Sequence, residues 1–90
     1  MYKDTFLFPV FKRHQHGRTW MRIEGPDSMT EVRVLGGYYN VLHIEARILP
    51  ERVMIADLLE DATGALDTAT AEEFEAFLAE CIKNKALREF

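Results

Sequence analysis

The fold is decided by residues 30–49, which read TEVRVLGGYYNVLHIEARIL. Two runs rich in β-branched, aromatic and aliphatic residues flank Gly36-Gly37, and this pattern predicts two antiparallel strands joined by a tight turn. A two-residue loop would pair Val34 with Tyr39. That register would leave the aliphatic residues of the second strand on the face opposite Val34.

A three-residue loop, Gly36-Gly37-Tyr38, pairs Leu35 with Tyr39 instead. One face of the hairpin then collects the alternating aliphatic residues, which are Val32, Val34, Leu42, Ile44, Ala46 and Ile48. Because a hairpin with one buried face gathers its apolar side chains there, the sequence predicts the three-residue loop, with a glycine in the left-handed conformation.

Another hairpin is predicted from residues 5–13 and 18–24, joined by His14-Gln15-His16-Gly17. With a four-residue loop, Arg13 faces Arg18 and Phe11 lies directly across from Trp20. A predicted core face then consists of Phe8, Val10, Met21 and Ile23.

Two helices are predicted after these strands. The first begins at Pro50, which needs no N–H in the first turn, and ends at Gly64 as a C-cap. The second follows a capping box formed by Thr70 and Glu73. Its apolar stripe consists of Phe74, Phe77, Leu78, Cys81 and Ile82.

The predicted fold class is therefore α+β: two β-hairpins form a four-stranded, mainly antiparallel sheet, followed by two helices packed on one face. Ninety residues suffice for one hydrophobic core, so residues 1–90 are expected to form a single domain. The second helix is expected to cover the face that carries Phe8 and Val10. Two short helices can cover one face of such a sheet, which leaves the opposite face open.

Composition places the chain among globular proteins, with 48% hydrophobic and 29% charged residues. Its one cysteine, Cys81, excludes an intrachain disulfide and favours a reducing compartment, so a cytoplasmic location is expected. The apolar run near the N-terminus is too short and too interrupted by proline for a membrane span. The net charge of −4 is unevenly distributed, because residues 1–49 carry seven Lys or Arg against five acids and residues 50–90 carry four against ten.

The open face of the predicted sheet is the candidate binding site. It combines aromatic, arginine and aliphatic side chains: Phe11, Arg13, Arg18, Trp20, Arg22, Tyr39 and Val41. This mixture is typical of protein–protein interfaces. It predicts a non-catalytic binding or adaptor-like module that acts as a homodimer or complex subunit, in which Trp20→Glu would give a folded monomer. The alternative is a small nucleic-acid-binding accessory protein that stacks bases on the aromatics, although the acidic chain offers only a thin basic stretch.

Catalytic and metal-binding motifs are scarce. His14 and His16 have a spacing found among metal ligands, but they fall in a loop without accompanying cysteines or carboxylates. His43 is expected to face Glu31 across the second hairpin. No nucleophile elbow or phosphate-binding glycine loop occurs, so the sequence predicts no metal, no cofactor and no enzymatic activity. An enzyme with a site between subunits ranks third among the functions considered.

Overall fold

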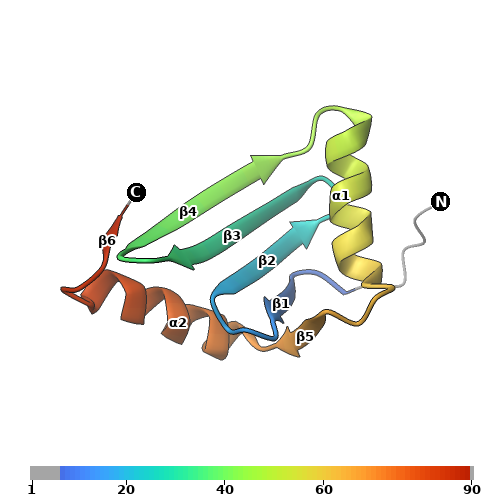
Figure 1. Cartoon of the computed structure of the whole chain (residues 1–90). Coiled ribbons are helices and arrows are strands. Elements are labelled where there is room, and N and C mark those ends of the chain that lie inside the picture. Colours follow the sequence, from blue (N-terminus) through green and yellow to red (C-terminus); the bar gives the residue numbers. More distant parts are fainter. Residues whose placement is uncertain (1–6, 90) are drawn as a thin grey trace.

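The computed structural model describes residues 7–89, and within them the chain forms a six-stranded sheet with two helices (Figure 1). In chain order the elements are β1 (Val10–His14), β2 (Thr19–Gly25), β3 (Ser28–Leu35), β4 (Tyr38–Glu45), α1 (Leu49–Glu60), β5 (Leu66–Ala69), α2 (Ala71–Lys83) and β6 (Arg88–Glu89). The strand order is β5-β1-β2-β3-β4-β6. Neighbouring strands are antiparallel except for β4 and β6, which are parallel. The α+β class with two β-hairpins and two helices is therefore confirmed.

The first hairpin differs from the predicted register by two residues. Phe11 lies opposite Arg22, and Arg13 lies opposite Trp20. The loop thus runs over residues 15–18 rather than 14–17. Because side chains alternate with a period of two, this even shift leaves every side chain on its predicted face.

The second hairpin has the two-residue loop, so the predicted three-residue loop is wrong. Leu35 pairs with Tyr38 and Val34 pairs with Tyr39, around a Gly36 with φ of +60°. The shift is one residue, so every β4 side chain changes face relative to the prediction. The prediction assumed that one sheet face is buried, whereas both faces of this hairpin pack against the rest of the protein.

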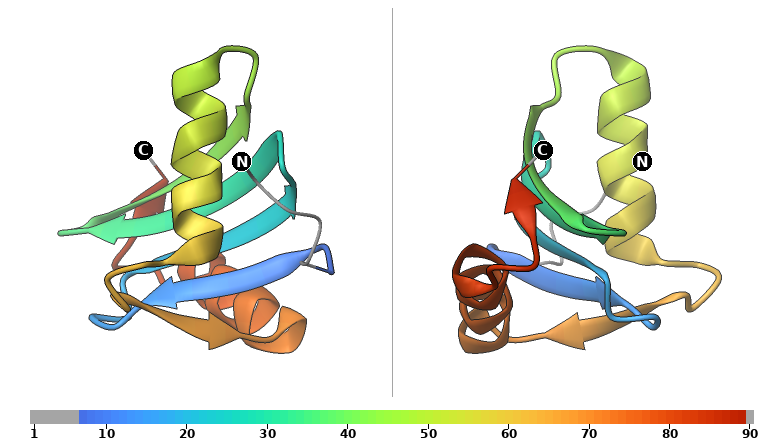
Figure 2. Two further views of the ribbon diagram at one scale, coloured as in Figure 1. Left: turned by 90° about the vertical axis from the view of Figure 1, so that its right-hand side faces the viewer. Right: turned by 60° about the vertical axis from the view of Figure 1, so that its left-hand side comes forward.

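The two helices lie on opposite faces of the sheet (Figure 2), which corrects the prediction that both pack on one face. Under α2 the sheet contributes Trp20, Val32 and Tyr39, which pack with Phe74 and Cys81. Under α1 it contributes other side chains: Met21, Ile23 and Met29 pack with Ile55 and Leu59, and Phe8 and Val10 lie at the margin. The predicted cover of Phe8 and Val10 by the second helix is therefore also wrong. Adjacent residues Trp20 and Met21 belong to different hydrophobic clusters.

Both helices begin where the sequence indicates. The Thr70 hydroxyl accepts a hydrogen bond from the Glu73 N–H at 3.1 Å, and the Glu73 carboxylate accepts one from the Thr70 N–H at 2.9 Å. This capping box satisfies two donors at the start of α2. Pro50 lies in the first turn of α1, as predicted, but α1 ends at Glu60 and its C-cap is Asp61, with φ of +46°, rather than Gly64. No helix in residues 7–89 is long and apolar enough to span a membrane.

Two strands were not predicted, and they border the sheet on its two sides. β5 pairs with β1 along four residues, from Phe11 opposite Ala69 to His14 opposite Leu66. β6 pairs only with the first two residues of β4, Tyr38 and Tyr39. One border of the sheet is therefore a four-residue strand, and the other is mostly β4 itself.

Candidate binding surfaces

The face predicted to be open is covered by α2. The sheet brings Phe11, Trp20 and Tyr39 to the α2 side, where Trp20 and Tyr39 each retain only 8% of their exposure. The Trp20 ring stacks on Phe77 of α2, with ring centroids 5.0 Å apart. The aromatic centre of the predicted site is thus part of the monomer's core, and only Val41 of its apolar members is exposed.

Two of the three arginines of that predicted site have side-chain partners within the chain. Arg13 lies 3.5 Å from the Asp67 carboxylate, and its guanidinium sits 5.6 Å from the centre of the Trp20 ring. Arg22 pairs with Glu24 at 2.8 Å and with Glu75 at 3.6 Å. Arg18 lies apart from both, exposed in the turn before β2. The three arginines therefore do not form one continuous basic surface.

A hydrogen-bonded cluster around Glu24 occupies the part of this face that lies beyond α2. The Glu24 carboxylate accepts hydrogen bonds from Arg22 Nε, from Ser28 Oγ at 3.1 Å and from Thr30 Oγ1 at 2.9 Å. Partial burial alone would raise the pKa of Glu24. The three hydrogen bonds and the charge of Arg22 outweigh that effect and hold the pKa below its ordinary value.

The lowered pKa of Glu24 predicts a pH-dependent contribution to stability. Because the folded state favours the carboxylate, this contribution is present above the unfolded-state pKa and is lost as pH falls through the lower folded-state pKa. We expect Glu24→Gln to lower the free energy of unfolding at neutral pH. The difference from the native chain should shrink in acid, as urea unfolding at several pH values can measure. A difference that stays constant down to strong acid would contradict the assigned role of the Glu24 charge.

The three histidines are not brought together. His14 and His16 stack with parallel rings, 5.0 Å between centroids, at the first hairpin loop. His43 lies on β4 opposite Thr30 rather than Glu31, and its ring contacts Thr30 Oγ1 and the Glu45 carboxylate at 3.0 Å each. Within the described part of the chain, no group of three or more histidine, cysteine or acidic side chains is placed to hold a metal ion.

The most accessible pairing surface is the outer edge of β4. β6 covers only Tyr38 and Tyr39, so from Asn40 to Glu45 no strand of residues 7–89 lies beside β4 on its outer side (Figure 1). The Val34 N–H donates to the carbonyl of Arg18, the residue just before β2, at 2.8 Å. The N–H and C=O groups of successive residues point to opposite sides of a strand, so the backbone groups of the next residue, Leu35, point toward β4.

This alternation fixes which β4 groups point outward. Tyr38 exchanges its backbone hydrogen bonds with Leu35 across the two-residue loop. The backbone N–H and C=O groups of Asn40, Leu42 and Ile44 therefore also point toward β3. The outward N–H and C=O groups beyond β6 therefore belong to Val41, His43 and Glu45. They form a regular row of donors and acceptors, which is a template for another strand.

Nothing in the composition of β4 blocks this edge. Proteins commonly protect an edge strand with lysine, proline, a bulge or short length. β4 has eight residues, with neither lysine nor proline among them, and Val41 and Leu42 are 38% and 46% exposed on its two faces. The opposite border, β5, has only four residues, half the length of β4. The two borders of the sheet thus differ in their capacity to accept a further strand.

Comparisons of the chain with protein-family models, with curated proteins and with solved structures found no match.

Proposed function

We propose that this protein is a non-catalytic association module that forms a homodimer through the outer edge of β4. The observation that carries the proposal is the row of outward backbone groups at Val41, His43 and Glu45, which has no strand beside it in residues 7–89. Backbone pairing at a strand edge is a common mode of protein association.

A second copy is the partner that this edge suits best. Two identical edges pair in antiparallel fashion about a two-fold axis, because each outward donor then meets an outward acceptor, and two-fold dimers are the commonest oligomers. If the two-fold axis passes through His43, the two copies of β4 pair over residues 41–45. This pairing does not displace β6, which pairs with Tyr38 and Tyr39. Leu42 then lies opposite Ile44 of the second copy, which buries an exposed leucine.

The other functions considered from the sequence have less support. Nucleic-acid binding called for an open face of aromatics and arginines, whereas Trp20 is buried under α2 and Arg13 and Arg22 are in ion pairs. An enzymatic site between subunits and a cytoplasmic location stay predictions.

The dimer can be tested by placing a charge on the β4 edge. We expect the native chain to show twice the mass of one chain in light scattering coupled to gel filtration, and Leu42→Lys to show the mass of a single folded chain. The lysine would place a charge between the two copies of β4, and burying that charge disfavours the dimer. Leu35→Lys is the matched control, since Leu35 is an exposed leucine on the neighbouring strand, away from the open edge, and should stay dimeric. A native chain that is monomeric at high concentration would contradict the proposal.

A further inference from the structure

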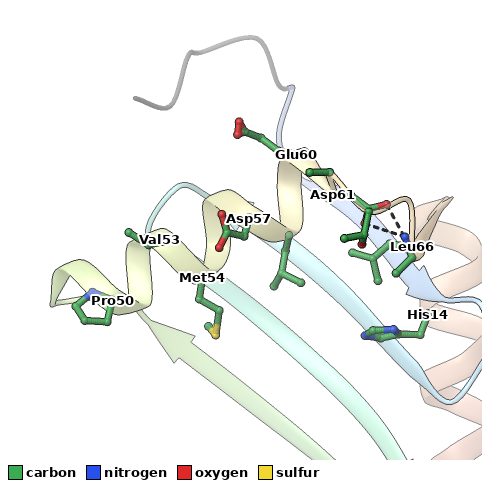
Figure 3. Close-up of a pocket in the computed structure, with 12 residues that line it drawn as sticks. His14, Pro50, Val53, Met54, Asp57, Glu60, Asp61 and Leu66 are labelled. Carbon is green, nitrogen blue, oxygen red and sulfur yellow. Dashed lines mark hydrogen bonds between the residues drawn. The ribbon is translucent and has the colours of Figure 1, made fainter.

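A second surface, separate from the β4 edge, lies along α1. A hollow of about 650 Å³ runs between α1, the loop that follows it and the end of β1 (Figure 3). Its apolar wall includes Val53, Met54, Leu58 and Leu66. Pro50 and His14 lie near opposite ends of the hollow, and α1 forms its long side (Figure 3).

α1 has apolar residues on two sides, although only one side packs on the sheet. Ile55 and Leu59 are buried against the sheet. Val53 and Met54 are 47% and 38% exposed beside the hollow. A surface helix ordinarily presents polar residues on its outer side, so an apolar outer side indicates a second packing partner.

The charges of the hollow are all acidic. Asp57 and Glu60 are exposed along its wall, and none of the lining residues is lysine or arginine. Within residues 7–89 neither carboxylate belongs to an ion pair. The nearby Lys12 ammonium is directed instead to the Leu59 carbonyl, at 2.9 Å, where it closes the end of α1.

Asp61 has a structural role in the same wall. Its two carboxylate oxygens accept hydrogen bonds from the N–H groups of Ala65 and Leu66, each at 3.1 Å. These bonds fix the loop between α1 and β5 against the helix. Hydrogen bonds of Asp61 therefore hold this end of the hollow in shape. Asp57 and Glu60 remain the carboxylates available to a ligand.

We propose that this hollow binds a basic amphipathic segment of a partner protein. One or two large apolar side chains of the segment would contact Met54, Leu58 and Leu66, and a lysine or arginine one helical turn away would pair with Asp57 or Glu60. The wall from Pro50 to Asp61 spans about 16 Å along the helix, the length of a three-turn helical segment. Amphipathic helices commonly dock in such grooves through apolar residues at this spacing. The site is independent of the β4 edge, so either proposal can fail without the other.

The test uses a random peptide library displayed on phage, selected against the full chain. We expect the enriched peptides to combine large apolar residues with lysine or arginine three or four positions away. A synthetic peptide from this set should bind about tenfold more weakly to Met54→Asp, the loss of about 1.4 kcal/mol. The affinity of this peptide for the double variant Asp57→Asn and Glu60→Gln should depend much less on salt concentration than its affinity for the native chain.

Three further variants identify where the peptide binds. Val53→Asp serves as a second disruption of the hollow should Met54→Asp unfold, as judged by circular dichroism. Ile82→Asp, at an exposed apolar position on α2, and Leu42→Lys, on the β4 edge, should bind the peptide with native affinity. Absence of enrichment, enriched peptides without basic residues, or binding that is lost with Leu42→Lys and kept with Met54→Asp would overturn the proposal.

Discussion

Replacing Trp20 with alanine is expected to lower the free energy of unfolding by about 3–5 kcal/mol, the range for deleting a large buried aromatic side chain. Trp20 is 8% exposed, stacks on Phe77 and carries the Arg13 guanidinium over its ring. Its indole N–H donates to the Gly17 carbonyl at 3.1 Å. The substitution removes all of these contacts together. Urea unfolding of the variant measures the loss.

Ile82→Ala is the matched control for Trp20→Ala. Ile82 is an exposed apolar residue of α2, so its replacement should change the free energy of unfolding by less than about 0.5 kcal/mol. The sequence-based hypothesis predicted a folded monomer for Trp20→Glu. Because that carboxylate would lie between the sheet and α2, we expect Trp20→Glu to unfold instead. A cost below about 1 kcal/mol for Trp20→Ala would contradict the packing of α2 on this face.

Replacing Ile55 with alanine should lower the free energy of unfolding by about 2–5 kcal/mol. Ile55 belongs to a different hydrophobic cluster from Trp20. Ile55 is fully buried between α1 and the other sheet face, where it packs with Met21, Ile23 and Leu59. Val53→Ala, two residues earlier and exposed on the outer side of α1, should stay within about 0.5 kcal/mol of the native chain. Equal effects of the two substitutions in urea unfolding would contradict the orientation of α1.

Local sequence signals predicted the elements well. The capping box of Thr70 and Glu73 marked the start of α2, and Pro50 marked the first turn of α1, because these residues satisfy or omit backbone donors wherever the helix lies. The first hairpin kept its two faces, since its register error was even. Signals of this kind depend on neighbours in the chain and not on tertiary packing.

The tertiary arrangement was harder to predict, because apolar alternation does not say which face a helix covers. Val32 and Ile44 are both partly or fully buried, yet they pack under different helices. Assigning them to one face produced the wrong loop, and placing both helices on one face left a surface around Trp20 that the prediction treated as open. The short strands β5 and β6 depend on long-range pairing with β1 and β4, which the composition of residues 66–69 and 88–89 does not reveal.

The predicted site illustrates the same limit. Aromatics and arginines on one side of a sheet are typical of an interface, but here Trp20 and Tyr39 fill the monomer's own core. Val41 is the predicted site residue that belongs to the open edge. The two-residue loop, which the sequence allowed, is what orients the Val41 and His43 backbone groups outward.

Amide hydrogen exchange along β4, measured at low and high protein concentration, tests the proposed dimer most directly. The N–H groups of Asn40, Leu42 and Ile44 face β3 and should be protected at every concentration. Those of Val41 and His43 should exchange freely in the dilute monomer and become protected as the dimer forms, and Leu42→Lys should abolish that gain. Exchange at Val41 and His43 that stays fast at the highest concentration would contradict pairing through this edge.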